Sequence, residues 1–274
     1  MPRSAGTRRF SLSDSDYPVS GKGRRETISL RAFVPNAITS LALCTGLSSA
    51  WFALQERWEL AAAMILVAGV LDGIDGRIAR LLKAQSRFGA ELDSLSDVIA
   101  FGVSPALLLF LWSLQHMPRF GWTTALFLAL CCALRLARYN ARMDEGDEPR
   151  KSAGYLTGVP APAGAGIALA PLFVNLATGA EWARMWWLVA PWTLLAAALM
   201  LSSVATFGWS SLRLRPSWRF PLLGLIGLYA AALISDPWLT MAGTTMIYLL
   251  MIPAAVIAFA RVRRSFRQRA EPRG

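Results

Sequence analysis

Four aspartates carry the chemistry to which the sequence points most clearly. Asp72 and Asp75 are three residues apart near the end of one apolar segment, and Asp93 and Asp97 are four residues apart near the start of the next. Residues three or four apart share one face of a helix, so each pair is expected to project from a single face. Ionisable groups beside hydrocarbon are costly, which makes these four aspartates candidates for function.

A turn at 83–89 would bring the two segments back antiparallel and set the two pairs of carboxylates opposite each other. Converging carboxylates repel one another unless cations lie between them. Carboxylate oxygens are ligands that Mg²⁺ and Mn²⁺ favour. The spacing therefore predicts a site for Mg²⁺ or Mn²⁺ where the two helices meet. The alternative interpretation is structural, with two buried acid pairs neutralised by nearby arginines.

The rest of the chain has the composition of an integral membrane protein. Of its 274 residues, 55% are hydrophobic and 16% are charged, and the mean hydropathy is +0.42. The apolar runs are too long for soluble domains, and backbone that faces lipid must be helical. We therefore expect an all-α polytopic membrane helix bundle with eight spans at 34–54, 60–77, 88–113, 122–141, 156–176, 185–205, 220–234 and 240–260.

Positive charge is distributed unequally between the two sides of this bundle. Of the 28 Lys and Arg residues, only Arg57, Arg119 and Arg184 fall on one side. Cytoplasmic loops carry the excess of Lys and Arg, so both termini and the acidic cluster are predicted to be cytoplasmic. The net charge of +11 reflects this bias and attraction to anionic lipid. Because the charge is scattered among membrane loops, we do not expect nucleic-acid binding.

The cysteines and the single histidine offer no second catalytic centre. Cys44, Cys131 and Cys132 fall within apolar spans without metal-ligand spacing, so we interpret them as packing residues. His116 lies in a short outer loop, far from the acids. A mechanism based on histidine is therefore not expected.

The spacing around the aspartates resembles the signature of the CDP-alcohol phosphatidyltransferases. Eight positions match it: Asp72, Asp75, Gly76, Ala79, Arg80, Gly89, Asp93 and Asp97. The resemblance implies a six-helix catalytic domain at 32–206, here followed by a further two-helix membrane segment at 207–262. It also implies a homodimer. The remaining residues are expected to form two basic cytoplasmic tails, at 1–31 and at 263–274. Residues 24–33, which overlap the first tail, are a candidate interfacial helix.

The same resemblance implies individual roles. Asp72, Asp75 and Asp93 would bind metal in a two-metal site, and Asp97 would lie against the metal and act as the base. The CDP group of the lipid substrate would be bound by a site that is shaped by Gly76, Ala79, Arg80 and Gly89.

Further runs resemble bacterial phosphatidylserine synthases within this family. They are PNAIT at 35–39, FGVSPA at 101–106, RLARYN at 135–140 and GVPAPAGA at 158–165. This combination implies transfer of the phosphatidyl group from CDP-diacylglycerol to the hydroxyl of L-serine, giving phosphatidylserine and CMP, in the bacterial inner membrane. Arg135 and Arg138 share a helical face and are candidates to hold phosphate or the serine carboxylate. Snorkelling arginines are the alternative interpretation of that pair.

Two other functions remain open at this stage. One is the same chemistry with another acceptor: glycerol 3-phosphate, inositol phosphate or choline. The other is transport of a divalent cation, although transporters usually place such acids near mid-membrane in internal repeats. Here the acids occur once, at one face, and are followed by arginines that would repel a cation.

Overall fold

The computed structural model describes residues 30–144, 155–202, 205–207 and 219–270. Nearly all of these are helical: α1 (Leu30–Leu54), α2 (Trp58–Leu81), α3 (Arg87–Asp97), α4 (Ser104–Trp112), α5 (Gly121–Asp144), α7 (Ala161–Thr178), α8 (Trp186–Leu201), α9 (Arg219–Ser235) and α10 (Pro237–Ala270). A π-helical segment, η1 (Val98–Val103), joins α3 to α4, and two short 3-10 helices are η2 (Leu114–His116) and η3 (Glu181–Arg184). Strands β1 (Tyr155–Thr157) and β2 (Ala205–Phe207) pair antiparallel.

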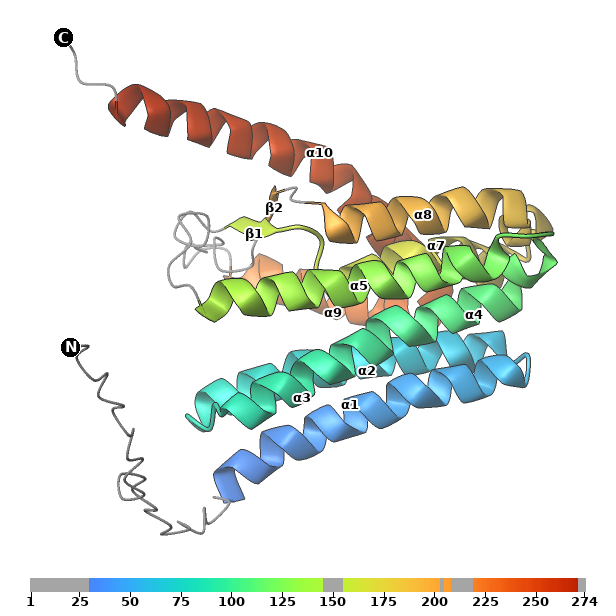
Figure 1. The fold of residues 1–274 in the computed structure, drawn as a ribbon, viewed down its shortest axis with the longest axis horizontal. Coiled ribbons are helices and arrows are strands. Elements are labelled where there is room, and N and C mark those ends of the chain that lie inside the picture. The colour runs from blue at the N-terminus through green and yellow to red at the C-terminus, as the bar shows by residue number, and fades with distance from the viewer. Residues whose placement is uncertain (1–29, 145–154, 203–204, 208–218, 271–274) are drawn as a thin grey trace, which may run out of the picture.

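The long helices run side by side as one bundle (Figure 1). Each of the eight expected spans corresponds to a helix, with α3, η1 and α4 forming one continuous span. Among the described residues, five helical segments are long and apolar enough to cross a membrane, and α8 and α9 are apolar but shorter. The predicted all-α polytopic membrane bundle is confirmed. The one sheet consists of two strands of three residues each.

The start of the fifth expected span, 156–176, is not helical, so this part of the prediction is wrong. Residues 155–157 form β1, Gly158 has a φ of +79°, and the helix begins only at Ala161, after Pro160. Glycine adopts positive φ without steric cost, and proline favours the first helical turn. β1 is paired with β2, and α10 packs against β2, so this non-helical backbone is covered by protein.

The third span changes its helical register close to Pro105, because proline inside a helix interrupts its hydrogen bonding. The backbone N–H of Ser104 bonds to the carbonyl of Ile99, five residues back, which defines the end of η1. Proline cannot donate a backbone hydrogen bond, and π-turns accommodate such an interruption inside a helix. The irregularity is buried: Phe101 and Pro105 are both in the interior.

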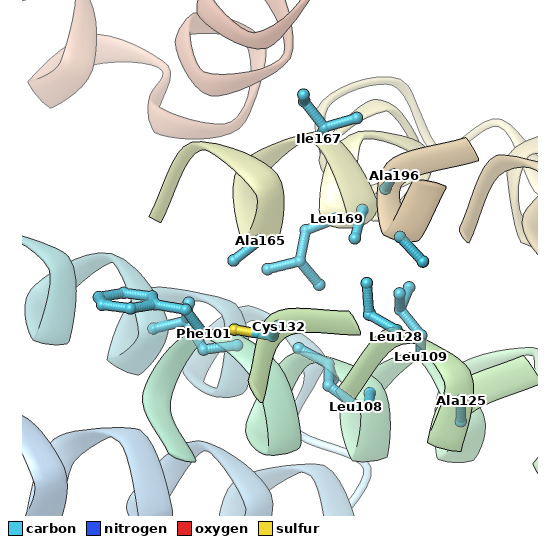
Figure 2. Close-up of a cluster of buried hydrophobic side chains, with 14 of the residues drawn as sticks. Phe101, Leu108, Leu109, Ala125, Leu128, Cys132, Ala165, Ile167, Leu169 and Ala196 are labelled. Carbon is cyan, nitrogen blue, oxygen red and sulfur yellow. The ribbon is translucent and has the colours of Figure 1, made fainter. Parts of the chain in front are cut away.

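The core lies between α4, α5, α7 and α8 (Figure 2). Phe101, Leu108 and Leu109 meet Leu128 and Cys132 of α5, together with small and aliphatic side chains of α7 and α8. Cys131 and Cys132 are fully buried, which confirms their prediction as packing residues. Cys44 is exposed on α1, so its predicted role as a packing residue finds no support within the single chain.

Arg184 of η3 contacts both α2 and α4 at the end of the bundle that contains the α1–α2 turn. Its Nε donates to the carbonyl of Trp112 at 2.9 Å, and its guanidinium lies 5.7 Å from the ring centre of Trp58. Ser113 donates to the Arg184 carbonyl at 2.6 Å. Exposed aromatic side chains gather near the same helix ends, as in the aromatic belts of membrane interfaces: Trp51, Phe120, Trp122, Trp182 and Trp187.

This arrangement predicts opposite accessibility for two exposed positions. In a variant without native cysteines, a cysteine at Gln85, between α2 and α3, will react with a membrane-impermeant maleimide from one side only. A cysteine at Glu181, in η3, will react only from the other side, and one at Gln55 will match Glu181. The charge distribution predicts that Gln85 is on the cytoplasmic side. Labelling of Gln85 and Glu181 from the same side would contradict the arrangement of spans.

Candidate active site

A tight turn between α2 and α3 brings the two halves of the acidic motif together. α2 ends at Leu81 and α3 begins at Arg87, and Ser86 caps α3 by accepting a hydrogen bond from the backbone N–H of Gly89 at 3.0 Å. Lys83, in the turn, has a φ of 50°. The turn predicted at 83–89 is therefore confirmed, and the two helices run antiparallel from it (Figure 1).

The four aspartates converge as their spacing predicts. Carboxylate oxygens of Asp72, Asp75 and Asp93 lie within 4.8 Å of one another. Asp97 is outside this trio, and its carboxyl group lies beside that of Asp72. Asp75 is the most buried of the four, with only 3% of its surface exposed.

Thr39 of α1 holds Asp75 in place. Its buried hydroxyl donates to Oδ2 of Asp75 at 2.5 Å. Ser96 of α3 in turn donates to the Thr39 carbonyl at 3.3 Å, so one turn of α1 contacts both helices of the motif. The PNAIT run includes Thr39, but sequence reasoning assigned it no role. Neither its spacing nor its type could identify a partner 36 residues away.

The donor set fits divalent metal better than the alternative of locally neutralised acids. Within the described part of the chain, no lysine or arginine forms an ion pair with any of the four carboxylates. Arg80 follows the aspartates on α2, yet its Nε donates to the carbonyl of Gly76 at 3.0 Å and not to a carboxylate. Oδ1 of Asp97 is buried and has no hydrogen-bond partner among the described residues. Oxygen ligands without a protein cation suit Mg²⁺ or Mn²⁺.

The surface of α2 beside this cluster is open. A methyl group added at Gly73 or Gly76 would meet no atom within 4 Å, so no neighbouring helix uses the space that these glycines leave. Ala79 and Arg80 continue along the same helix. Gly89 differs, because a methyl group there would lie 2.9 Å from Oδ1 of Asn36, on α1. Gly89 thus permits the close approach of Asn36 to the motif, a contact that sequence reasoning missed.

The two arginines of the RLARYN run have different surroundings. Arg135 interacts electrostatically with Asp97, and its Nε is buried without a hydrogen-bond partner in the described structure. Arg138 instead donates from Nη2 to the Ser202 carbonyl at 3.2 Å, after the end of α8. Asn140, from the same run, donates to Ser94 of α3 at 2.9 Å and ties α5 to the motif. The structure therefore places Arg135, but not Arg138, beside the aspartates.

Comparisons with known proteins agree with this geometry. The family model for CDP-alcohol phosphatidyltransferase matches residues 32–204, and a second model, CDP-alcohol phosphatidyltransferase 2, matches residues 217–253. A CDP-diacylglycerol–serine O-phosphatidyltransferase of Mycobacterium tuberculosis is 38% identical over 237 residues, which cover 86% of this chain and 82% of the relative. One from Mycobacterium leprae is 36% identical over 232 residues, covering 85% and 77%. A third, from Helicobacter pylori, is 35% identical over 131 residues, covering 48% and 53%.

The first family match spans more than half of the chain and contains all four aspartates. The two mycobacterial relatives extend the similarity through most of the sequence. The chain therefore belongs to the CDP-alcohol phosphatidyltransferase family.

Proposed function

We propose that this membrane protein transfers the phosphatidyl group of CDP-diacylglycerol to the hydroxyl of L-serine, giving phosphatidylserine and CMP. The observation that carries this proposal is the cluster of Asp72, Asp75 and Asp93 on the two antiparallel helices of the family signature. The serine acceptor is supported by relatives that are named CDP-diacylglycerol–serine O-phosphatidyltransferases.

In the proposed mechanism, Asp72, Asp75 and Asp93 would hold two divalent cations, Mg²⁺ or Mn²⁺. Bound there, such cations would neutralise the pyrophosphate and stabilise CMP as the leaving group. The open face of α2 at Gly76, together with Ala79, Arg80 and Gly89, shapes the CDP site. The diacylglycerol tails stay in the lipid beside these helices.

Asp97 is proposed as the general base. Its carboxylate accepts the proton of the serine hydroxyl while that oxygen attacks the phosphorus that bears diacylglycerol. The bond from this phosphorus to the CMP oxygen breaks, so the phosphatidyl group moves to serine and CMP departs. Transfer of this kind depends mainly on positioning and charge stabilisation, and the fixed carboxylates would supply the latter through the cations that they bind.

The remaining proposals concern the setting of the enzyme. The asymmetry of Lys and Arg supports a cytoplasmic active site with both termini on that side. Similarity to bacterial enzymes supports the inner membrane as its location. The homodimer that the family resemblance implies stays a prediction.

A panel of acceptors tests the function directly. Purified protein with CDP-diacylglycerol and Mg²⁺ or Mn²⁺ will form phosphatidylserine and CMP from L-serine, as identified by mass spectrometry of the lipid product. Glycerol 3-phosphate, inositol phosphate and choline will give little product. Use of glycerol 3-phosphate in place of serine would overturn the acceptor while leaving the family intact.

Removal of one metal ligand is expected to abolish most activity. Asp93→Asn withdraws a charge from the trio, so kcat will fall by more than roughly 100-fold and Mn²⁺ will bind more weakly. EDTA will inactivate the wild type, and added Mg²⁺ or Mn²⁺ will restore it. The matched control is Glu91→Gln, an exposed acid on the same helix, which will retain activity. Full turnover of the wild type in metal-free buffer would exclude the metal site.

Loss of the Thr39 hydroxyl is expected to weaken metal binding rather than folding. Thr39→Val keeps the side-chain shape but removes the donor to Asp75, so the apparent Mn²⁺ affinity will fall roughly tenfold. Thr39→Ser retains the hydroxyl and will restore the affinity. The control is Thr45→Val, because Thr45 donates only to backbone carbonyls of its own helix. Equal Mn²⁺ affinities in Thr39→Val and wild type would remove Thr39 from the site.

Arg135 is the first candidate for binding the serine carboxylate. Losing a charged hydrogen bond in a partly desolvated site costs roughly 2–5 kcal/mol, so Arg135→Ala will raise KM for serine far more than KM for CDP-diacylglycerol. Arg138, the second candidate, contacts Ser202, so the same measurement on Arg138→Ala separates the two. If both variants raise only KM for CDP-diacylglycerol, the arginines serve the nucleotide lipid.

A further inference from the structure

The segment formed by α3 and η1 contacts α5 at two levels of the bundle. In the interior, a methyl group added at Gly102 of η1 would lie 3.0 Å from Cβ of Cys132, so the two helices approach closely there. Toward the helix ends that carry the aspartates, Nδ2 of Asn140 donates to Oγ of Ser94 at 2.9 Å. The earlier residue of one segment pairs with the later residue of the other, so the two segments run antiparallel.

The proposed base and the first candidate for binding the acceptor fall in the interval between these two contacts. Asp97 lies between the two contact positions of α3 and η1, and Arg135 lies between the two contact positions of α5. Oδ1 of Asp97 and Nε of Arg135 are both buried and have no hydrogen-bond partner among the described residues. Leaving buried polar groups unpaired costs free energy, so this interval favours a ligand that bonds to both groups. Serine fits it, with a hydroxyl for the carboxylate and a carboxylate for the guanidinium.

Other side chains hold each of these two segments to its own neighbours. Ser96 donates to the Thr39 carbonyl at 3.3 Å, which holds α3 against α1. Arg138 donates to the Ser202 carbonyl at 3.2 Å, which holds the end of α5 beside the end of α8. Residues two apart on a helix point roughly 200° apart, so Arg138 and Asn140 leave α5 on nearly opposite sides. Asn140 therefore links the helices that carry the aspartates to the helix that carries Arg135.

We propose that Asn140 is a positioning residue for the acceptor, whose hydrogen bond to Ser94 fixes the separation of α3 and α5 and thus the space between Asp97 and Arg135. Asn140 acts through the helices and does not contact the acceptor. Without this bond, the ends of α3 and α5 can move apart, and an acceptor can no longer reach both groups at once. This role deepens the proposed function and rests on it. It also gives the last residue of the RLARYN run a part in the reaction.

Removing either partner of the hydrogen bond tests the proposal. Asn140→Leu keeps the size of the side chain but removes the donor, so KM for serine will rise about fivefold, the effect of one lost hydrogen bond. KM for CDP-diacylglycerol and the Mn²⁺ affinity will stay within about twofold of wild type, because α3 remains bonded to α1. Ser94→Ala will reproduce this pattern, and Ser94→Thr, which retains the hydroxyl, will not. The matched control is Asn175→Leu, which removes a donor to the Ala180 carbonyl near η3 and will alter neither KM.

A double-mutant cycle shows whether Asn140 acts through Ser94. Because both substitutions break the same bond, Asn140→Leu combined with Ser94→Ala will raise KM for serine no further than either alone. A rise in Asn140→Leu without one in Ser94→Ala would mean that Asn140 contacts the acceptor directly, which would overturn the positioning role. A lower melting temperature with an unchanged KM for serine would overturn it too. A wild type that uses another acceptor would refute only the proposed function, and the same comparison with that acceptor would then decide the role of Asn140.

Discussion

Repulsion among clustered carboxylates is the constraint on which this structure depends. Three ionised groups within 4.8 Å of one another repel by roughly 3 kcal/mol per pair at an effective dielectric constant near 20. The sum over three pairs is comparable to the whole stability of a typical domain, about 5–15 kcal/mol. The cluster is tolerable only if cations or bound protons offset it, and the helices must be rigid enough to keep the ligands together. Contacts from outside the motif supply that rigidity: Thr39 on Asp75, and Asn140 on Ser94.

The sequence predicts the aspartate cluster better than it predicts the tertiary contacts around that cluster. Spacing three and four residues apart, with a turn between, is enough to infer that the aspartates converge, because helix periodicity and chain reversal are local properties. Thr39 could not be assigned in this way, since its partner Asp75 lies 36 residues away and the contact depends on how helices pack. Arg135 and Arg138 share a helical face, yet only the tertiary structure shows that one approaches Asp97 and the other Ser202.

The departures from expected helix have a common physical origin. The π-helical turn before Pro105 and the strand before Ala161 both occur where proline or glycine interrupts a helical run. Inside a membrane such backbone must be covered by protein. Both interruptions are covered, η1 by α1 and α5, and β1 by β2, which α10 packs against. Residues that read as helix breakers in the sequence therefore lie where neighbouring elements pack against the backbone.

The reaction brings a lipid substrate and a water-soluble substrate to the same site. In the proposed mechanism, CDP-diacylglycerol arrives from lipid and would use an open helix face such as the one that Gly73 and Gly76 leave beside the aspartates. Serine arrives from water and would need a fixed cation, which can coexist with the proposed base only if the two are held apart. The carboxylates belong to α2 and α3, and Arg135 belongs to α5. Distributing these groups over separate helices lets packing, rather than attraction between charges, set the distance from Arg135 to Asp97.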